Sequence, residues 1–454
     1  MTLWSAYCSL RQFTGAGVDR RVFLCTMIVP TCVCRPLFAL FLLLWLTPVY
    51  GQRTVKTEDY PDGKPQLYAE QLDGQADGLW LEWYPNGQLR YRARWKEGKG
   101  HGLWEYFYED GQLRSRSVYD ADQPIGDYLE YHPNGELASV ATYVAGQRHG
   151  LAYTYDPTGT ELTRQLWLLG ERRIDRPEHF APGSVSTDAG DEWDVTFSVT
   201  GGELYFTRRP VDRSSSQRIY RSTRAEDGTW TPARLATFST ATDEGAFLCD
   251  DGRRLYFASY RPLPDRAPLV DTDMNLWYVE RRDSAWGEPI VLSSTINRVM
   301  QPADRWPYRY EAGPSVDAAG SLYYWSALEA DGSADLLVAT MTADGTFGEP
   351  SLLTALNTLG SESSPVVSPD GRLLCFAAYG RPDGFGQEDL YCARREEEGW
   401  GEALNLGPTI NSNANEGCAR FSPDGRYFYF CSDRGEGGQS DIFYLETEFL
   451  TLPE

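Results

Sequence analysis

Histidine is scarce in this chain: the 454 residues include only four, and none lies beyond residue 179. They are His101, His132, His149 and His179. The region after residue 179 therefore cannot hold a histidine-based catalytic triad or a histidine-ligated metal. The G-x-S-x-G motif of serine hydrolases is missing as well. These absences exclude the hydrolase and lyase chemistries that depend on such groups in that region.

Basic residues are also few: 42 Lys and Arg face 65 Asp and Glu, a formal charge of −23. Nucleic acids and anionic lipid surfaces need a positive footprint, so they are excluded as general partners. Without residues 1–51, 38 basic and 64 acidic residues remain, a charge of −26. Residues 174–454 hold 24 basic and 45 acidic residues, which is −21 of that total. We expect a basic protein or a neutral glycan as partner.

The chain lacks a convincing membrane span. The apolar run "LFALFLLLWL" at residues 37–46 has ten residues, too few to cross a bilayer as a helix. It follows Arg35 and ends shortly before the small residue Gly51, which predicts a signal-peptide region over 1–51 with cleavage before Gln52. Met27 is an alternative start. We expect an exported protein of the periplasm, outer surface or extracellular space, without a stable membrane span.

Cysteines show no C-x-x-C spacing, and four of the nine lie within residues 1–51. The remaining five occur in strand-like apolar runs: Cys249, Cys375, Cys392, Cys418 and Cys431. Buried single thiols are the first expectation. A Cys375–Cys392 or Cys418–Cys431 disulfide is the alternative in an oxidising compartment.

Glycines keep a strict 24-residue spacing in the first part of the chain: Gly63, Gly87, Gly111, Gly135 and Gly159. Asn-Gly and Asp-Gly turns separate strand-like runs such as "LWLEWY" and "QLRYRARW", which predicts stacked β-hairpins over residues 52–173. An aromatic row on one face, with Trp83 and Phe107 in register with Leu89 and Leu113, is either the hairpin core or a ligand-stacking surface.

The stretch "GLWLEWYPNGQLRYRARWKEGKGHGLWEYFYEDGQL" resembles the variant MORN repeat, G-x-W-x-x-Y-Y-x-N-G-x-L. The resemblance covers about four units. It implies an elongated single-layer β scaffold for contact with a partner rather than a catalyst.

A second repeat begins near residue 184. Five glycines each precede an aromatic by five residues and follow an acid by nine: Gly201, Gly252, Gly320, Gly371 and Gly425. The units are 51, 68, 51 and 54 residues apart, and each offers four short strands. Such units predict an all-β chain whose residues 174–454 form a β-propeller of five blades, or of six if residues 293–310 hide strands. Residues 179–187 are expected to supply the missing outer strand of the last blade.

The tandem "SPDGR" turns at residues 368–372 and 422–426, each followed by "DLY" or "DIF", resemble the TolB type of WD40-like propeller repeat, whose signature continues to W-G-E-P, as in "WGEPIVL" and "WGEALNL". The first three units keep the frame without Pro-Asp. The resemblance implies a binding propeller of the cell envelope or a secreted protein, and no particular activity.

The five repeated acids are a candidate ligand site: Glu192, Asp243, Glu311, Glu362 and Glu416. They are expected at the start of the innermost strands, where carboxylates could face the axial channel and bind a cation or a basic peptide. Because they recur in every blade, a structural role as acceptors of backbone N–H groups is the favoured interpretation. Asp335, Asp389 and Asp441, with Asn275, are expected to cap turns. "DTDMN" at 271–275 resembles only the start of a calcium loop.

Two insertions break the repeat symmetry, at residues 260–275 and 294–310. They bring aromatic and basic side chains into loops, where binding residues concentrate on rigid scaffolds. The candidates are Tyr260, Arg261, Arg266, Arg305, Trp306, Tyr308 and Arg309. The alternative is loop decoration packed on the ring.

Together these features predict a non-enzymatic scaffold or recognition protein, without cofactor or metal, that binds an envelope protein or glycan. The alternative is a carbohydrate-active or peptide-cleaving enzyme that uses carboxylates at the mouth of the propeller. A glycosidase needs only two carboxyl groups at a suitable separation, so the lack of histidine does not exclude it.

Overall fold

The computed structural model describes residues 51–249, 251–264, 269–283, 285–330, 332–435 and 437–450. The apolar run at 37–46 and Met27 lie outside the described residues, as does Arg266. The described chain is nearly all β, as predicted; its helical segments are α1 (Gly407–Ile410) and the 3-10 turn η1 (Thr447–Phe449). None of its helices is long and apolar enough to cross a membrane.

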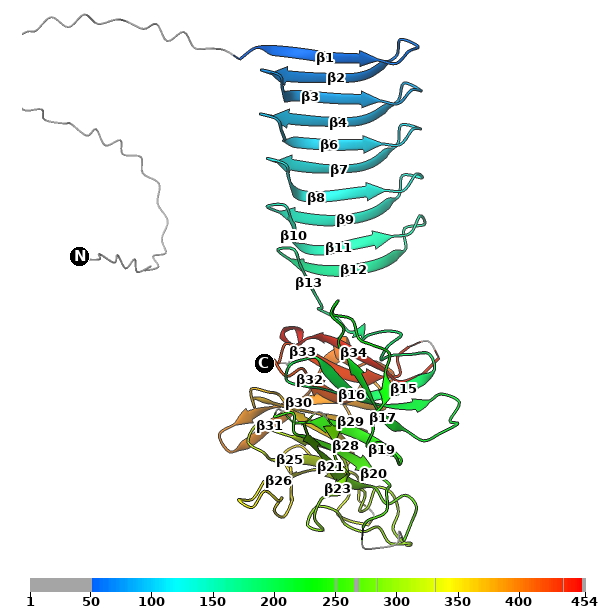
Figure 1. Cartoon of the computed structure of the whole chain (residues 1–454), viewed down its shortest axis with the longest axis vertical. Coiled ribbons are helices and arrows are strands. Elements are labelled where there is room, and N and C mark those ends of the chain that lie inside the picture. Colours follow the sequence, from blue (N-terminus) through cyan, green and yellow to red (C-terminus); the bar gives the residue numbers. More distant parts are fainter. Residues whose placement is uncertain are drawn as a thin grey trace, which may run out of the picture. The chain divides into compact units, whose positions relative to one another are not determined.

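The N-terminal repeats form one antiparallel sheet with 13 strands among the described residues (Figure 1). Neighbouring strands follow chain order, while the short strands β5 and β10 pair with β4 and β9. The sheet begins earlier than residue 60, where the glycine repeat starts. The strands are β1 (Arg53–Asp59), β2 (Pro65–Leu72), β3 (Gln75–Trp83), β4 (Leu89–Lys96), β5 (Lys99–Gly100), β6 (Gly102–Phe107), β7 (Leu113–Asp120), β8 (Gln123–Tyr131), β9 (Leu137–Val144), β10 (Gln147–Arg148), β11 (Gly150–Tyr155), β12 (Glu161–Leu168) and β13 (Glu171–Arg173).

The repeated glycines close tight turns between paired strands. Gly87 has a φ of 89°, in the left-handed region that favours glycine, and its N–H donates to the carbonyl of Tyr84 at 2.8 Å. The Asn86 side chain accepts the N–H of Gln88 at 2.9 Å. The structure therefore has the tight Asn-Gly turn that the sequence predicts between these strands.

A second repeated contact joins each hairpin to the next. Tyr60, Tyr84 and Tyr108 donate their hydroxyls to backbone carbonyls 23 residues further on, at 2.7 to 2.9 Å. His132 occupies the same position in the next unit, and its Nε2 lies 2.8 Å from the carbonyl of Tyr155. These bonds satisfy acceptors at strand ends and fix the spacing of the units.

One face of this sheet carries a row of aromatic rings. Trp80, Trp95, Trp104 and Tyr119 lie in sequence across β3, β4, β6 and β7, with centroid separations of 6.0, 5.0 and 4.4 Å. All four are half-buried, and Trp104 packs directly on Gly100, where an added Cβ would lie 2.5 Å from the ring. The predicted pairs Trp83–Leu89 and Phe107–Leu113 are also confirmed. The packed row is thus a different one from the predicted row of Trp83 and Phe107, and its rings form part of the core of the hairpin sheet.

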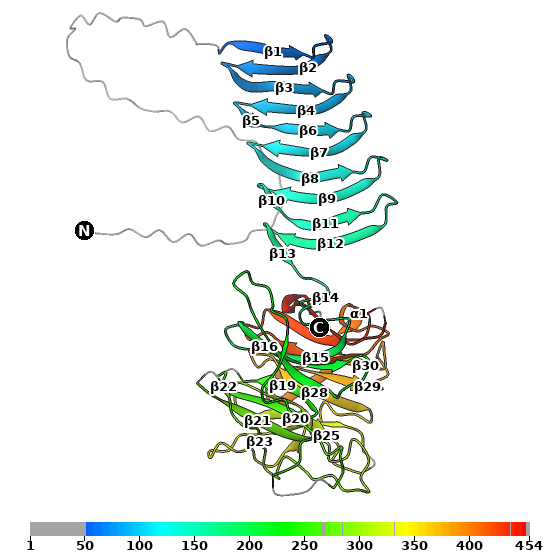
Figure 2. The same cartoon turned by 45° about the vertical axis from the view of Figure 1, so that its right-hand side comes forward.

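The remaining strands form five sheets arranged as propeller blades (Figure 2). The innermost strands contact one another in a closed cycle, β15 to β19, β24, β28, β32 and back to β15. The blades are β15 (Gly190–Phe197), β16 (Glu203–Pro210), β17 (Arg218–Thr223) and β18 (Arg234–Leu235); β19 (Asp243–Leu248), β20 (Arg254–Ser259), β21 (Asn275–Arg282), β22 (Ala285–Trp286) and β23 (Ile290–Val291); β24 (Ala312–Val316), β25 (Leu322–Ser326), β26 (Asp335–Ala339) and β27 (Ser351–Leu352); β28 (Ser361–Val367), β29 (Leu373–Tyr379), β30 (Glu388–Glu396) and β31 (Gly399–Asn405); and β32 (Glu416–Phe421), β33 (Tyr427–Ser432), β34 (Asp441–Glu446) and β14 (Glu178–His179).

The last blade closes as the sequence predicted. Strand β14, which precedes the first blade in the chain, pairs antiparallel with β34 near the C-terminus. The N–H of Phe180 continues the ladder to the carbonyl of Ile442 at 2.8 Å. The paired residues are 178–180, at the start of the predicted segment 179–187. The six-blade alternative is wrong, because residues 293–310 contribute only an isolated bridge, between Tyr308 and Ala327.

Every innermost strand has a β-bulge at the same place, two residues after the repeated acid. The residues there all have φ between 50° and 69°: Asp194, Gly245, Gly313, Ser364 and Cys418. At Gly313 a Cβ would lie 3.2 Å from the Cα of Ser364 in the next blade. Close approach of neighbouring strands at the centre of the ring therefore accompanies this bulge.

The cysteines divide into two kinds. Cys375 and Cys392 face each other across β29 and β30 and form a disulfide, so the expectation of single thiols is wrong for this pair. Direct cross-strand pairing brings their Cα atoms to 4.0 Å. Cys249, Cys418 and Cys431 are not disulfide-bonded, so the second bridge considered from sequence is not formed. The Cys418 thiol hydrogen-bonds Cys431, which together with burial raises its pKa.

Candidate functional site

The five repeated acids lie where the innermost strands begin, on one face of the ring that we call the start face. All five are fully buried: Glu192, Asp243, Glu311, Glu362 and Glu416. Each carboxylate accepts a backbone N–H from the loop or strand end beside it. The donors are Thr187, Ala241, Arg298, Thr358 and Ser412, at 2.8 to 3.2 Å.

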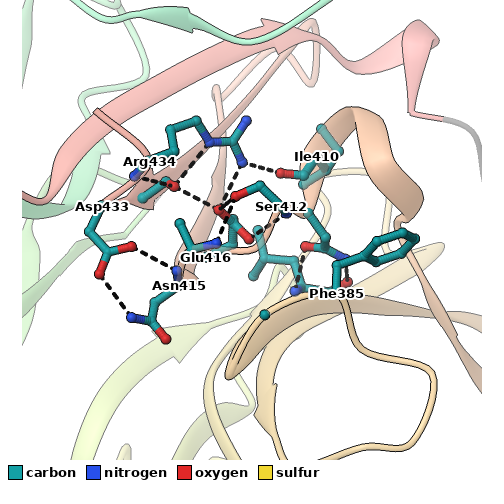
Figure 3. A network of polar contacts seen from close by, with 12 residues as sticks. Phe385, Ile410, Ser412, Asn415, Glu416, Asp433 and Arg434 are labelled. Atoms are coloured by element: carbon teal, nitrogen blue, oxygen red, sulfur yellow. Dashed lines mark hydrogen bonds and ion pairs between the residues drawn. The ribbon is translucent and has the colours of Figure 1, made fainter. Parts of the chain in front are cut away.

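Each of these acids is also paired with an arginine. The pairs are Glu192–Arg208 at 2.7 Å, Asp243–Arg261 at 2.7 Å, Glu311–Arg298 at 3.5 Å, Glu362–Arg381 at 3.0 Å and Glu416–Arg434 at 3.0 Å. Figure 3 shows the last of them: Glu416 lies between Arg434 and Ser412, and Arg434 also donates to the carbonyl of Ile410. The hydroxyl of Ser432 donates to the same carboxylate at 2.7 Å. A buried carboxylate with this set of partners has no free face for a ligand.

The backbone at the acid positions joins one blade to the next. The N–H of Glu192 donates to Ser440 of the last blade at 2.7 Å, and that of Glu362 donates to Ala334 of the third blade at 2.8 Å. Asp243 makes the same bond to Gln217. These direct contacts are those that a structural role of the acids requires. No group of three or more metal-ligating side chains occurs among the described residues.

Burial shapes the electrostatics of this network. It raises the pKa of Glu192 to about 7 and that of Glu311 to about 8, while Arg208 and Arg298 oppose the rise. The Glu311–Arg298 pair is the longest of the five. Its arginine comes from the loop before the blade, whereas the other four come from the second strand of the same blade or lie two residues after it.

Sequence reasoning missed the partners of the acids, although two signals were present. All 24 basic residues of 174–454 are arginine, which suits buried bidentate pairing better than lysine does. Asn297, Asn357 and Asn411 each bridge the N–H and carbonyl of a leucine 21 residues earlier, at 2.7 to 3.1 Å. Both are repeated structural devices.

Two of the other repeated polar positions, Asp389 and Asn275, bond the local backbone. Asp389 accepts the N–H groups of Phe385 and Gly386, as the turn-cap prediction requires. Asn275 donates to the carbonyl of Asp273, within the "DTDMN" segment. Asp273 itself accepts the N–H of Met300 at 3.3 Å. These bonds hold the 271–275 segment against the loop that contains Met300.

Some side chains of the two loops that break the repeat are bonded to the ring, and others are exposed. Arg261 is bonded to Asp243, and Arg309 lies over Tyr308 and donates to Asp304 at 3.4 Å. Arg305 is exposed. Trp306 is 65% exposed, more than any other aromatic residue among the exposed large hydrophobics of the described chain.

Trp306 belongs to a cluster of four aromatic rings. Its ring contacts Tyr310 and Trp325 edge-on at centroid distances of 6.2 and 6.3 Å, and those two rings stack on each other at 5.3 Å. The hydroxyls of Tyr310 and Tyr260 lie 3.2 Å apart. We call Tyr260, Trp306, Tyr310 and Trp325 the aromatic cluster.

Two carboxyl groups on the start face differ from the repeated acids, and neither was identified from the sequence. Glu244, next to Asp243, lies near Tyr310 and accepts from Gln217 Nε2 at 2.8 Å. Glu388 accepts from the Ser363 hydroxyl at 3.1 Å. Both are partly exposed and form no ion pair within the described ranges, and burial raises the pKa of each to about 7. Their repeat positions carry other residue types in the other blades, so periodicity could not mark them.

Comparison with known proteins identifies part of this chain. Residues 76–97, 100–121 and 124–145 match the MORN repeat variant family, within the predicted hairpin repeats. No curated protein matches the chain.

Solved structures resemble the chain only distantly. An α-L-arabinofuranosidase from Lactobacillus brevis is 14% identical, with a TM-score of 0.39 over 57% of this chain and 90% of that one. An endo-arabinase from Bacteroides thetaiotaomicron VPI-5482 is 12% identical, with a TM-score of 0.38 over 60% and 98%. A putative TolB from Agrobacterium tumefaciens is 14% identical, with a TM-score of 0.33 over 75% and 94%. Similarity at this level carries no argument about activity.

Proposed function

We propose that this protein is a non-catalytic recognition protein that binds a protein or glycan through the start face of its propeller. One observation carries the proposal: the side chains that break the five-fold repeat put an exposed Trp306 on a packed aromatic base. An aromatic ring that is both exposed and held by neighbours provides contact area at little cost in conformational entropy.

The loop around Trp306 supplies the other contacts. Arg305 is exposed, while Tyr308 and Arg309 stack and are held by Asp304 and the carbonyl of Val299. In this proposal Arg305 and Trp306 touch the ligand, and Arg309 positions the loop. The repeated acids keep the ring rigid beneath it, because their bonds join neighbouring blades. The hairpin sheet serves as a second contact surface.

An exported protein fits this role. The Cys375–Cys392 disulfide supports export, because disulfides persist in oxidising compartments. The charge of −21 on residues 174–454 disfavours nucleic acid as a partner.

The test is retention of a ligand by the purified protein. We would immobilise residues 52–454 and apply separated protein, polysaccharide and lipid fractions of the source cells at moderate salt. Retained material should be lost with the triple variant Arg305→Ala, Trp306→Ala, Arg309→Ala. A matched triple variant at exposed positions of the fourth blade, Arg372→Ala, Phe385→Ala and Arg394→Ala, should retain it. Equal retention by both variants would contradict the proposal.

The enzymatic alternative depends on Glu244 and Glu388. A carboxyl group with a pKa near 7 is protonated often enough to act as a general acid at neutral pH. If retained polysaccharide is released as shortened products, and Glu244→Gln or Glu388→Gln stops the shortening, the non-catalytic assignment is wrong.

A further inference from the structure

The aromatic cluster and Glu244 form one continuous arrangement in the space between the second and third blades. Tyr310 connects them: its ring contacts Trp306, its hydroxyl lies 3.2 Å from that of Tyr260, and Glu244 lies beside it. Gln217 holds the other side of the carboxyl group at 2.8 Å. A single tyrosine side chain therefore separates an exposed indole face from a carboxyl, an amide and two hydroxyls.

The indole of Trp306 is a fixed platform. Two rings contact its edge, and Tyr310 beneath it is 6% exposed, whereas Trp306 itself is 65% exposed. Stacking on a ring that is already held costs less conformational entropy than stacking on a mobile one. The position is specific to this part of the ring, because the loop at 294–310 has no counterpart in the other blades.

The polar groups beside the platform suit hydroxyl groups. Glu244 and Gln217 each offer acceptor positions, and Gln217, Tyr260 and Tyr310 offer donors. Unlike the repeated acids, Glu244 has no ion pair among the described residues, so its hydrogen-bonding capacity is not consumed by an arginine. Ligand sites commonly combine an apolar surface with a few such placed polar groups.

Charge narrows the class of ligand. Asp304 lies within the loop, burial together with the charge of Asp194 raises the pKa of Glu244, and the whole propeller region carries −21. An acidic ligand would be repelled. A cationic ligand would need an ionised carboxylate facing it, and burial works against that state at Glu244. An uncharged ligand with one flat apolar face and many hydroxyls fits both halves of the site.

We propose that the start face binds a neutral glycan, with one sugar ring stacked on Trp306 and the hydroxyls of the next bonded by Glu244 and Gln217. This inference rests on the proposed function and names its ligand class. A protein ligand is the competing outcome.

The test is titration calorimetry of the full chain from residue 52 with uncharged hexasaccharides, namely cello-, xylo-, manno- and maltohexaose. Polygalacturonate and polylysine serve as charged probes. We expect at least one neutral probe to bind. Trp306→Ala should weaken it about tenfold or more, as loss of a central aromatic contact does. Trp306→Phe should keep most of the affinity.

Three further variants separate the site from general effects. Glu244→Gln keeps hydrogen-bonding groups and should bind within about threefold of the parent, whereas Glu244→Ala should lose about tenfold. Phe385→Ala removes an aromatic side chain that is 48% exposed on the fourth blade and should change nothing. Urea midpoints of all variants report whether any loss reflects unfolding.

The outcomes distinguish the two proposals. Binding of a neutral hexasaccharide that survives Trp306→Ala would overturn the inference. So would binding of polylysine alone. If no sugar binds while a protein is retained through Arg305, Trp306 and Arg309, the glycan inference fails and the recognition function stands. If the sugar is shortened, the glycan site stands and the non-catalytic function fails.

Discussion

The hairpin sheet and the propeller join their repeat units by different kinds of contact. Each must join units that cannot bury an apolar face alone. The hairpin sheet joins them with side chains that stay partly exposed, such as the hydroxyl of Tyr84 on the carbonyl of Phe107. The propeller joins them through the backbone of fully buried acids, such as the N–H of Glu192 on the carbonyl of Ser440 in the last blade, and pairs each acid with a partly buried arginine.

This difference indicates where function resides. A polar residue that recurs in every blade already has its hydrogen bonds and ion pairs within the ring. Function is then to be sought where the repeat is broken, and in this propeller that is Trp306 and its neighbours. In the hairpin sheet the aromatic row repeats along the chain, and its rings pack on one another.

The largest effect is expected from breaking a buried pair in the propeller. Arg434→Ala leaves the carboxylate of Glu416 buried without its cation, which should cost about 3–5 kcal/mol of unfolding free energy. Urea unfolding measures it. The matched control is Arg372→Ala: Arg372 is 84% exposed and lies 3.8 Å from Asp370, so its loss should leave the midpoint unchanged. Equal midpoints for the two variants would refute the structural role of the acids.

A smaller loss is expected at the asparagine bridges. Asn411→Ala removes a buried side chain that bonds both the N–H and the carbonyl of Leu390, at 2.8 and 2.9 Å. Leaving these groups unpaired should cost about 1–3 kcal/mol by urea unfolding. Asn413→Ala, at an exposed position two residues away, is the control and should have no effect. A change of the same size at Asn413 would mean that the loop, rather than the bridge, matters.

The hairpin sheet should respond more weakly. Tyr84→Phe removes only the hydroxyl that bonds Phe107, a loss of about 0.5–1.5 kcal/mol. Hydrogen exchange of the amides in β3 to β7 should quicken locally. Tyr131→Phe is the control, because Tyr131 pairs with Leu137 across β8 and β9 and its hydroxyl makes no hydrogen bond among the described residues. If exchange quickens throughout the sheet, the hairpins unfold together rather than one by one.

The last prediction concerns pH. Burial raises the pKa of Glu311 to about 8, above its ordinary value of 4.5. The folded state therefore binds more protons than the unfolded state between these values, and stability should fall as pH rises from about 4.5 to about 8. Glu311→Gln should flatten that slope in urea midpoints measured across this range. An unchanged slope would assign the pH dependence to other groups.

Much of the fold could be predicted from the sequence, because short turn motifs mark where its strands end. The 24-residue glycine spacing marks hairpin turns that need positive φ, and the "SPDGR" turns mark the second strand of two blades. Closure by residues near 179 followed from counting strands. The partners of the acids could not be predicted, since Arg298 and Arg434 reach Glu311 and Glu416 from different sides of the repeat.

Only part of the candidate site could be predicted from the sequence. Trp306 stood out because its loop interrupts the repeat. Glu244 and Tyr310 lie 66 residues apart and meet only when the second and third blades pack together. Neither has a repeated spacing, and Glu244 is hidden beside the repeated Asp243.

The most direct test compares two variants in two measurements, Arg434→Ala and Trp306→Ala, each by ligand retention and by urea midpoint. We expect Arg434→Ala to lower the midpoint and Trp306→Ala to abolish retention with its midpoint unchanged. That separation would show that the repeated network holds the ring and the interrupted repeat binds. If Trp306→Ala lowers the midpoint as much as Arg434→Ala and leaves retention intact, Trp306 is a structural residue and the account is wrong.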